Sequence, residues 1–160
     1  MLTPQQLLLK LTKNVTLNQL CVTNYPEYRM VNLEYGYSMR IELKKTAIMF
    51  EYLCEMFGPL LVTSGIRCSA LNEDKRVGSN SNSAHPRGEA LDFKPVLEGI
   101  TVMQIFEQLR KNKDFLVGQV IVYADEGFIH ISRFVGRSKR DFRICRLVNG
   151  KRTYEKITVA

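Results

Sequence analysis

Apolar positions in the first third of the chain recur with helical spacing. Thr3-Pro4-Gln5-Gln6 predicts a helix start, with a hydroxyl cap, proline at the first helical position and glutamine three residues after the cap. A second short helix is predicted after Thr16. Residues 21–36 are irregular and rich in Asn, Tyr and Pro, so they predict a loop. Ser38 is expected to cap the longest helix, over residues 38–57.

Shorter apolar segments in the rest of the chain predict strands. Asn149-Gly150 is a strong hairpin turn, and the alternation of apolar and polar residues slips near Cys145, which predicts a bulge there. The pattern predicts one α+β domain with a mostly antiparallel sheet and helices packed on it. The expected strands are 60–63, 89–93, 117–123, 128–134, 142–148 and 152–159, the expected helical segments are 69–76 and 101–111, and 77–88 is an expected loop.

Composition limits the class of protein. The 160 residues suffice for a single domain, 1–160, and 45% hydrophobic with 24% charged residues is ordinary globular usage. No apolar run approaches the roughly 18 residues of a membrane span, and no signal peptide is recognisable, so we expect a cytoplasmic product that does not contact membrane. The four cysteines form no Cys-x-x-Cys pair, which favours buried free thiols.

The positive charge is concentrated at the C-terminal end. The net charge is +7, and the basic and acidic residues of 1–132 cancel, so the excess lies in 133–160, a predicted basic β-hairpin. Nucleic-acid binding is one interpretation, but aromatic interleaving is thin and no nucleic-acid motif is present. Charged hairpin edges also block edge-to-edge pairing, and we rank nucleic acid last among the partners. The basic residues concerned are Arg137, Lys139, Arg140, Arg143, Arg146, Lys151 and Arg152.

The candidate chemistry lies in the two histidines and one aspartate. Asp92 alternates with Leu91 and Phe93 on a predicted strand, and His130 lies between Ile129 and Ile131 on another. With His85, they would form a catalytic zinc set of three protein ligands. A strand histidine between isoleucines is also a common structural residue, so spacing alone leaves both interpretations open.

Three segments carry a resemblance to a known family. They are Thr63-Ser-Gly-Ile-Arg-Cys-Ser-Ala-Leu-Asn72, Ser83-Ala-His-Pro-Arg-Gly-Glu-Ala-Leu-Asp92 and Phe128-Ile-His-Ile-Ser132. In this order they resemble the zinc D-Ala-D-Ala carboxypeptidase family, whose superfamily includes D-Ala-D-Ala dipeptidases, phage endolysins and the Hedgehog signalling domain. The likeness spans residues 14–132, and it implies a Hedgehog/DD-peptidase-like fold.

The resemblance also implies roles for single residues. His85, Asp92 and His130 would hold Zn²⁺, which would activate water and polarise the scissile carbonyl. Arg67 would engage the substrate near that carbonyl, and Ser83 would lie near the substrate terminus. The interpretation of Arg67 as a surface ion pair is the alternative.

The chain departs from the family at the general base. The family usually carries a carboxylate three or six residues before the last histidine, and those positions are Gly127 and Ala124 here. Asp125 and Glu126 lie between them, and either is a candidate base. Asp125 is favoured because it directly follows the predicted strand, and solvated turn acids are the alternative.

Two functions from different classes follow. The first is a zinc-dependent peptidase that hydrolyses a D-amino-acid-containing bond in peptidoglycan, as a phage lysis or entry protein that acts at the cell wall after release or from the virion. The second is a catalytically silent relative, a wall-binding or virion structural module that keeps zinc for stability.

Overall fold

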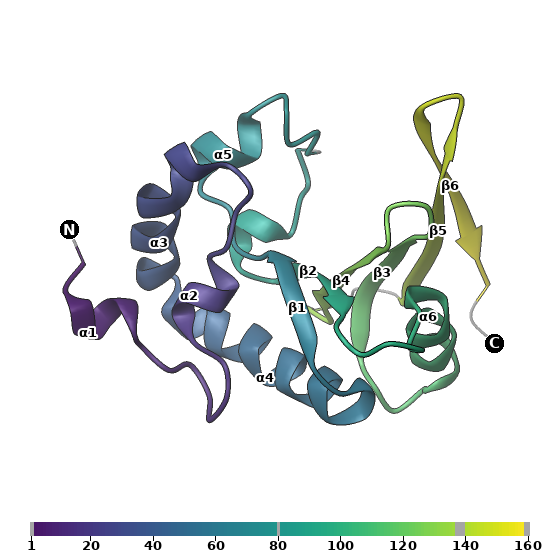
Figure 1. Cartoon of the computed structure of the whole chain (residues 1–160), viewed down its shortest axis with the longest axis horizontal. Coiled ribbons are helices and arrows are strands. Elements are labelled where there is room, and N and C mark those ends of the chain that lie inside the picture. Colours follow the sequence, from purple (N-terminus) through teal and green to yellow (C-terminus); the bar gives the residue numbers. More distant parts are fainter. Residues whose placement is uncertain (1, 80, 137–139, 159–160) are drawn as a thin grey trace.

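The computed structural model describes residues 2–79, 81–136 and 140–158. Figure 1 shows the first helices grouped beside β1 at one end of the sheet and the β5–β6 hairpin at the other end. The elements are α1 (Pro4–Leu7), α2 (Leu17–Leu20), η1 (Pro26–Tyr28), α3 (Arg29–Ser38), α4 (Arg40–Phe57), β1 (Leu60–Ser64), α5 (Ser69–Glu73), η2 (His85–Arg87), β2 (Ala90–Pro95), α6 (Val102–Lys111), β3 (Val117–Tyr123), β4 (Phe128–Arg133), β5 (Asp141–Val148) and β6 (Lys151–Ile157).

The strands form one six-stranded sheet in the order β1-β2-β4-β3-β5-β6. β3 and β5 pair in parallel, and the other pairs among the described strands are antiparallel. The α+β class and the mostly antiparallel sheet predicted from the sequence are confirmed.

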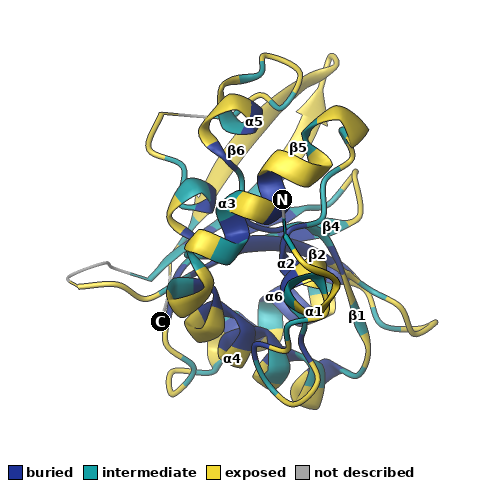
Figure 2. Ribbon diagram, turned by 90° about the vertical axis from the view of Figure 1, so that its left-hand side faces the viewer, coloured by how far each residue is buried: buried dark blue, intermediate teal, exposed yellow. Residues whose placement is uncertain are grey.

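The sheet has one buried face and one open face. Side chains alternate across a strand, so the residues between the polar positions of β2 and β4 point into the core. Phe93 meets Phe50 of α4 with 6.4 Å between ring centroids, and Phe142 of β5 meets Phe106 of α6 at 5.6 Å. Figure 2 shows this burial along the sheet and the inner sides of the helices. Polar groups are therefore confined to the opposite face.

The predicted helix starts at Thr3, Thr16 and Thr101 are confirmed. Each threonine hydroxyl accepts a hydrogen bond from the backbone N–H three residues on, and the glutamine there bonds back to the threonine N–H. These capping boxes satisfy donors that have no partner inside the helix.

Two predictions about the first helices are wrong. Residues 29–38 form helix α3 rather than a loop, and Ser38 ends that helix, where its hydroxyl donates to the Tyr35 carbonyl, instead of capping α4. The Asn, Tyr and Pro residues of 21–36 misled the prediction, since a segment rich in them usually forms a loop. Here glycine is needed inside the helix, because a Cβ at position 36 would collide with the Cys21 thiol.

The bulge predicted at Cys145 is also wrong. Cys145 lies opposite Tyr123 and Tyr154 in registers that run without interruption. The apparent slip in alternation arises because Cys145 is buried on the open face, the same face as Asp141 and Arg143 of its own strand. Register shifts occur instead between Val62 and Ser64 and between Val117 and Val120.

The cysteines and the helix lengths can be compared with what the sequence predicted. All four cysteines are free, and three of them are buried while Cys54 is partly exposed. Among the described residues, no helix combines the length and apolar character that crossing a membrane requires.

Candidate metal centre

Two adjacent strands bring Asp92 and His130 together. Asp92 of β2 lies directly opposite His130 of β4 in the antiparallel register. Residues paired in this way share a face, and their side chains are close. The neighbours Leu91 and Ile131 are fully buried on the other face. The strands are thereby anchored by apolar residues, which fixes where the two polar side chains project.

His85 approaches the same place from the loop before β2. Its Nδ1 lies 2.6 Å from the Gly65 carbonyl oxygen, so Nδ1 carries the proton and donates it there. This tautomer leaves Nε2 as the free acceptor. Two helices hold the turn that follows, because Tyr35 donates to the Pro86 carbonyl and Thr46 to the Gly88 carbonyl.

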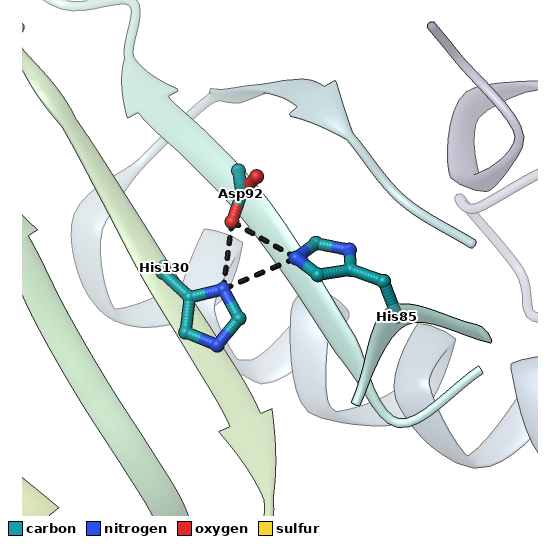
Figure 3. Close-up of side chains that lie close together, drawn as sticks. All are labelled: His85, Asp92 and His130. Carbon is teal, nitrogen blue, oxygen red and sulfur yellow. Dashed lines mark hydrogen bonds and ion pairs between the residues drawn. The ribbon is translucent and has the colours of Figure 1, made fainter. Parts of the chain in front are cut away.

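The three side chains converge on one point (Figure 3). Asp92 Oδ1 lies 2.8 Å from His130 Nδ1 and 3.3 Å from His85 Nε2, and the two ring nitrogens are 3.2 Å apart. One ligand atom from each residue lies within 4.8 Å of the others, so the group could hold a metal ion. Two imidazole nitrogens and one carboxylate oxygen are a donor set that fits Zn²⁺ and leaves a fourth position for substrate or water.

The surroundings of the cluster keep both kinds of ligand in the form that binds a cation. Burial lowers the pKa of the His85 imidazole, which keeps the ring neutral. Burial on its own would raise the pKa of Asp92, but attraction and hydrogen bonds from the two imidazoles outweigh it and hold that pKa below its usual range. A neutral imidazole and an ionised carboxylate are the forms that bind metals.

Arg67 lies against this cluster. Its Nη2 donates to Asp92 Oδ2 over 2.9 Å, and its Nε donates to the Ser64 hydroxyl over 3.1 Å. The Arg67 side chain is only 13% exposed, which excludes the alternative of a surface ion pair. Burial lowers the pKa of Arg67, and the Asp92 carboxylate opposes that shift.

Asn32, which the sequence did not indicate, fixes the backbone on both sides of Arg67. The buried Asn32 amide donates to the Ile66 and Cys21 carbonyls, and its oxygen accepts from the Cys68 N–H. An asparagine between the apolar residues Val31 and Leu33 could have signalled a buried polar position, had the segment been recognised as a helix.

The cluster lies in an open cleft of about 1080 Å³, which Arg67 and Ser83 also line. The Ser83 hydroxyl accepts a hydrogen bond from the His85 N–H. Side chains of the C-terminal hairpin, including Arg152 and Tyr154, line the same cleft. The structure therefore brings Arg67, Ser83 and the three candidate ligands together.

The two candidate bases bind the hairpin. Asp125 accepts from the Leu147 N–H over 2.7 Å, and Glu126 accepts two hydrogen bonds from Arg152, at 2.6 and 2.9 Å. Glu126 lines the cleft, whereas Asp125 is not among the lining residues described. Neither shares a hydrogen bond with the cluster in the described part of the chain.

This fold and this cluster define a class: α+β proteins with a His-Asp-His group able to hold a metal on the open face of a sheet. A family model described as Peptidase M15 matches residues 11–132, and the chain belongs to that family. The resemblance to the zinc D-Ala-D-Ala carboxypeptidases, the family's metal-dependent peptidases, is thus confirmed. No curated protein and no solved structure matches the chain.

Proposed function

We propose that the protein is a zinc-dependent peptidase that hydrolyses a D-amino-acid-containing bond in peptidoglycan, in the lysis or entry of a phage. The observation that supports this most is the convergence of His85, Asp92 and His130 within one cleft. Family membership supports a metallopeptidase acting on peptidoglycan-type substrates.

The protein's own side chains supply binding and orientation. His85 and His130 offer ring nitrogens to the metal, and Asp92 offers Oδ1 while Arg67 holds Oδ2. A bound Zn²⁺ supplies Lewis acidity toward the scissile carbonyl and lowers the pKa of water. Arg67 lies beside Asp92, and its planar guanidinium suits a developing negative charge.

Proton transfer needs a further group in the cleft. Hydrolysis of an amide requires that a proton leave the attacking water and reach the leaving amine. Glu126 is a carboxylate that lines the cleft, and Arg152 holds it from β6. We favour Glu126 over Asp125, because Glu126 lines the cleft and Asp125 is not among the described residues that line it.

A second function is favoured by one specific feature. Gly127 and Ala124 occupy the positions where the family usually has its base, and both turn acids already have partners. A silent relative that binds the wall, or forms part of a virion, and keeps the metal for stability would show these features.

Incubation with purified peptidoglycan separates the two functions. The zinc-loaded protein should release peptides or D-alanine detectable by mass spectrometry, and excess chelator should abolish the release. His130→Ala is the matched inactive control. Stoichiometric zinc with no released product would favour the silent relative, and product release that persists in chelator would exclude a metallopeptidase.

A further inference from the structure

Ion pairs account for nearly every charge that lines the cleft. Six arginines line it, and each forms an ion pair with a carboxylate at 2.9 Å or less. These arginines are Arg67, Arg76, Arg87, Arg133, Arg143 and Arg152. The lining carboxylates are all members of such pairs as well: Glu89, Asp92, Glu126 and Asp141.

Lys94 is the exception. It lines the same cleft and is exposed, and among the described residues no carboxylate pairs with it. Its positive charge is therefore uncompensated in a cleft where the other fixed charges described are neutralised by pairing. A positive charge without a carboxylate partner attracts an anion from solution.

The position of Lys94 relates this charge to the cluster. Lys94 lies two residues after Asp92 on β2, so both side chains point to the open face, while Phe93 between them is fully buried. The strand rise puts the two Cα atoms about 7 Å apart. The side chain of Lys94 has a flexible stem of four carbons. When the scissile bond of a peptide lies at the cluster, the Lys94 ammonium can reach substrate groups about one residue away from that bond.

We propose that Lys94 binds a carboxylate of the substrate, one residue from the scissile bond. This deepens the proposed peptidase function and rests on it. The carboxylate has two sources in a peptide, the free C-terminus or an acidic side chain. The first would make the protein a carboxypeptidase, and the second would allow it to cut within a longer chain.

Binding of uncleavable probes tests the proposal without depending on turnover. The probe is a Lys-D-Ala-D-Ala tripeptide with a methylene-amine in place of the scissile amide, made as the C-terminal acid and as the C-terminal amide. A third probe has an amidated terminus and a free D-glutamate side chain next to the same bond. Calorimetry on the zinc-loaded protein gives each dissociation constant, and hydrolysis of the natural tripeptide is measured in parallel.

The expected result is that the wild type binds one carboxylate probe about 10-fold more tightly than the amide, as for a charge-assisted hydrogen bond. Lys94→Met should remove that preference, and Lys94→Arg should keep most of it. Lys156→Met is the matched control, since Lys156 is exposed on β6 outside the cleft, and it should change nothing. Preference for the terminal acid identifies the C-terminus, and preference for the glutamate probe identifies a side chain.

Two outcomes would overturn the proposal: equal binding of all three probes by the wild type, or a preference that survives Lys94→Met. An equal loss of the preference for a carboxylate probe in Lys156→Met would also overturn the proposal, because the net charge of the protein would then explain the preference. If carboxylate binding depends on Lys94 but neither the natural tripeptide nor purified peptidoglycan is hydrolysed, the peptidase function fails and the binding site stands.

Discussion

Asp92 uses its two carboxylate oxygens for different partners. Oδ1 faces both histidines, and Oδ2 accepts from Arg67. Groups that hydrogen-bond a metal ligand orient it and tune its affinity, and removing one typically costs 10- to 100-fold in metal binding. Arg67 therefore has a positioning role in addition to the substrate contact that the resemblance implies.

Replacement of Arg67 tests this positioning role. Arg67→Ala should weaken zinc binding by about 10- to 100-fold in competition with a chelating dye. At saturating zinc it should still lower kcat/KM by roughly 10²-fold if the guanidinium stabilises the transition state. Arg143→Ala is the control, because Arg143 lines the same cleft but pairs with Asp141. Unchanged zinc affinity in Arg67→Ala would contradict the positioning role.

The buried imidazole of His85 predicts a pH dependence for the metal-free protein. Burial lowers the His85 pKa below its ordinary value of 6.5, so the unfolded chain binds the proton more readily. The free energy of unfolding should therefore be highest above about pH 6.5. It should decrease as the pH drops below this value, by at most about 1.4 kcal/mol per pH unit. Urea unfolding between pH 8 and 5 measures this.

His85→Gln is the matched variant for that titration. The chain has two histidines, and the variant removes the buried imidazole at position 85 while keeping His130. Its stability should depend less on pH than that of the wild type. An equal slope in both proteins would show that His85 is not the group responsible.

Replacement of the two candidate bases should have different effects on turnover. Glu126→Gln should lower kcat by roughly 10²- to 10⁴-fold, the usual contribution of general-base catalysis, and leave the zinc content intact. Asp125→Asn should have a smaller effect on turnover, because Asp125 binds the Leu147 N–H of the hairpin. Wild-type turnover in both variants would show that neither carboxylate is the base.

At the scale of elements, helix α3 holds the loop that carries Arg67. Asn32 satisfies three buried backbone groups in two neighbouring segments. A buried polar group left without a partner costs about 1–3 kcal/mol, so Asn32→Ala should lower the free energy of unfolding by about 3 kcal/mol or more. Asn18→Ala, at an exposed site on α2, should have little effect in the same denaturant titration. Equal losses in both variants would contradict this role for Asn32.

The sequence correctly predicted those features that depend on residues close together in the chain. Capping at Thr101 depends on residues three apart, and the Asn149-Gly150 turn depends on two residues of positive φ, 52° and 72°. Helix α3 was missed because the Asn, Tyr and Pro residues of 21–36 predict a loop, whereas Asn32 and Gly36 serve contacts with distant segments. Burial of Cys145 on the open face likewise comes from its neighbours on β3 and β6.

The residues of the candidate site were predicted from the sequence, but the contacts between them were not. The resemblance indicated His85, Asp92, His130, Arg67 and Ser83, and these side chains line one cleft. The bond from Arg67 to Asp92 and the pairing of Glu126 with Arg152 depend on strand order and on the parallel pairing of β3 with β5. No sequence spacing encodes such contacts.

At the scale of the whole molecule, the hairpin completes one wall of the cleft. The family match ends at residue 132, yet Arg152 and Tyr154 of β6 line the cleft with the cluster. Arg152 lies 5.0 Å over the Tyr123 ring and also holds Glu126. The basic segment for which nucleic-acid binding was one interpretation therefore also lines the candidate active site.

Stepwise return of zinc to the metal-free protein tests the central claim most directly. The substrate is an acetylated Lys-D-Ala-D-Ala tripeptide, and released D-alanine is measured at each addition. We expect hydrolysis to rise linearly and reach a plateau at one zinc per chain, because His85, Asp92 and His130 form a single site. Hydrolysis that is independent of zinc, or none at any ratio on this peptide or on purified peptidoglycan, would contradict the assignment of a zinc peptidase.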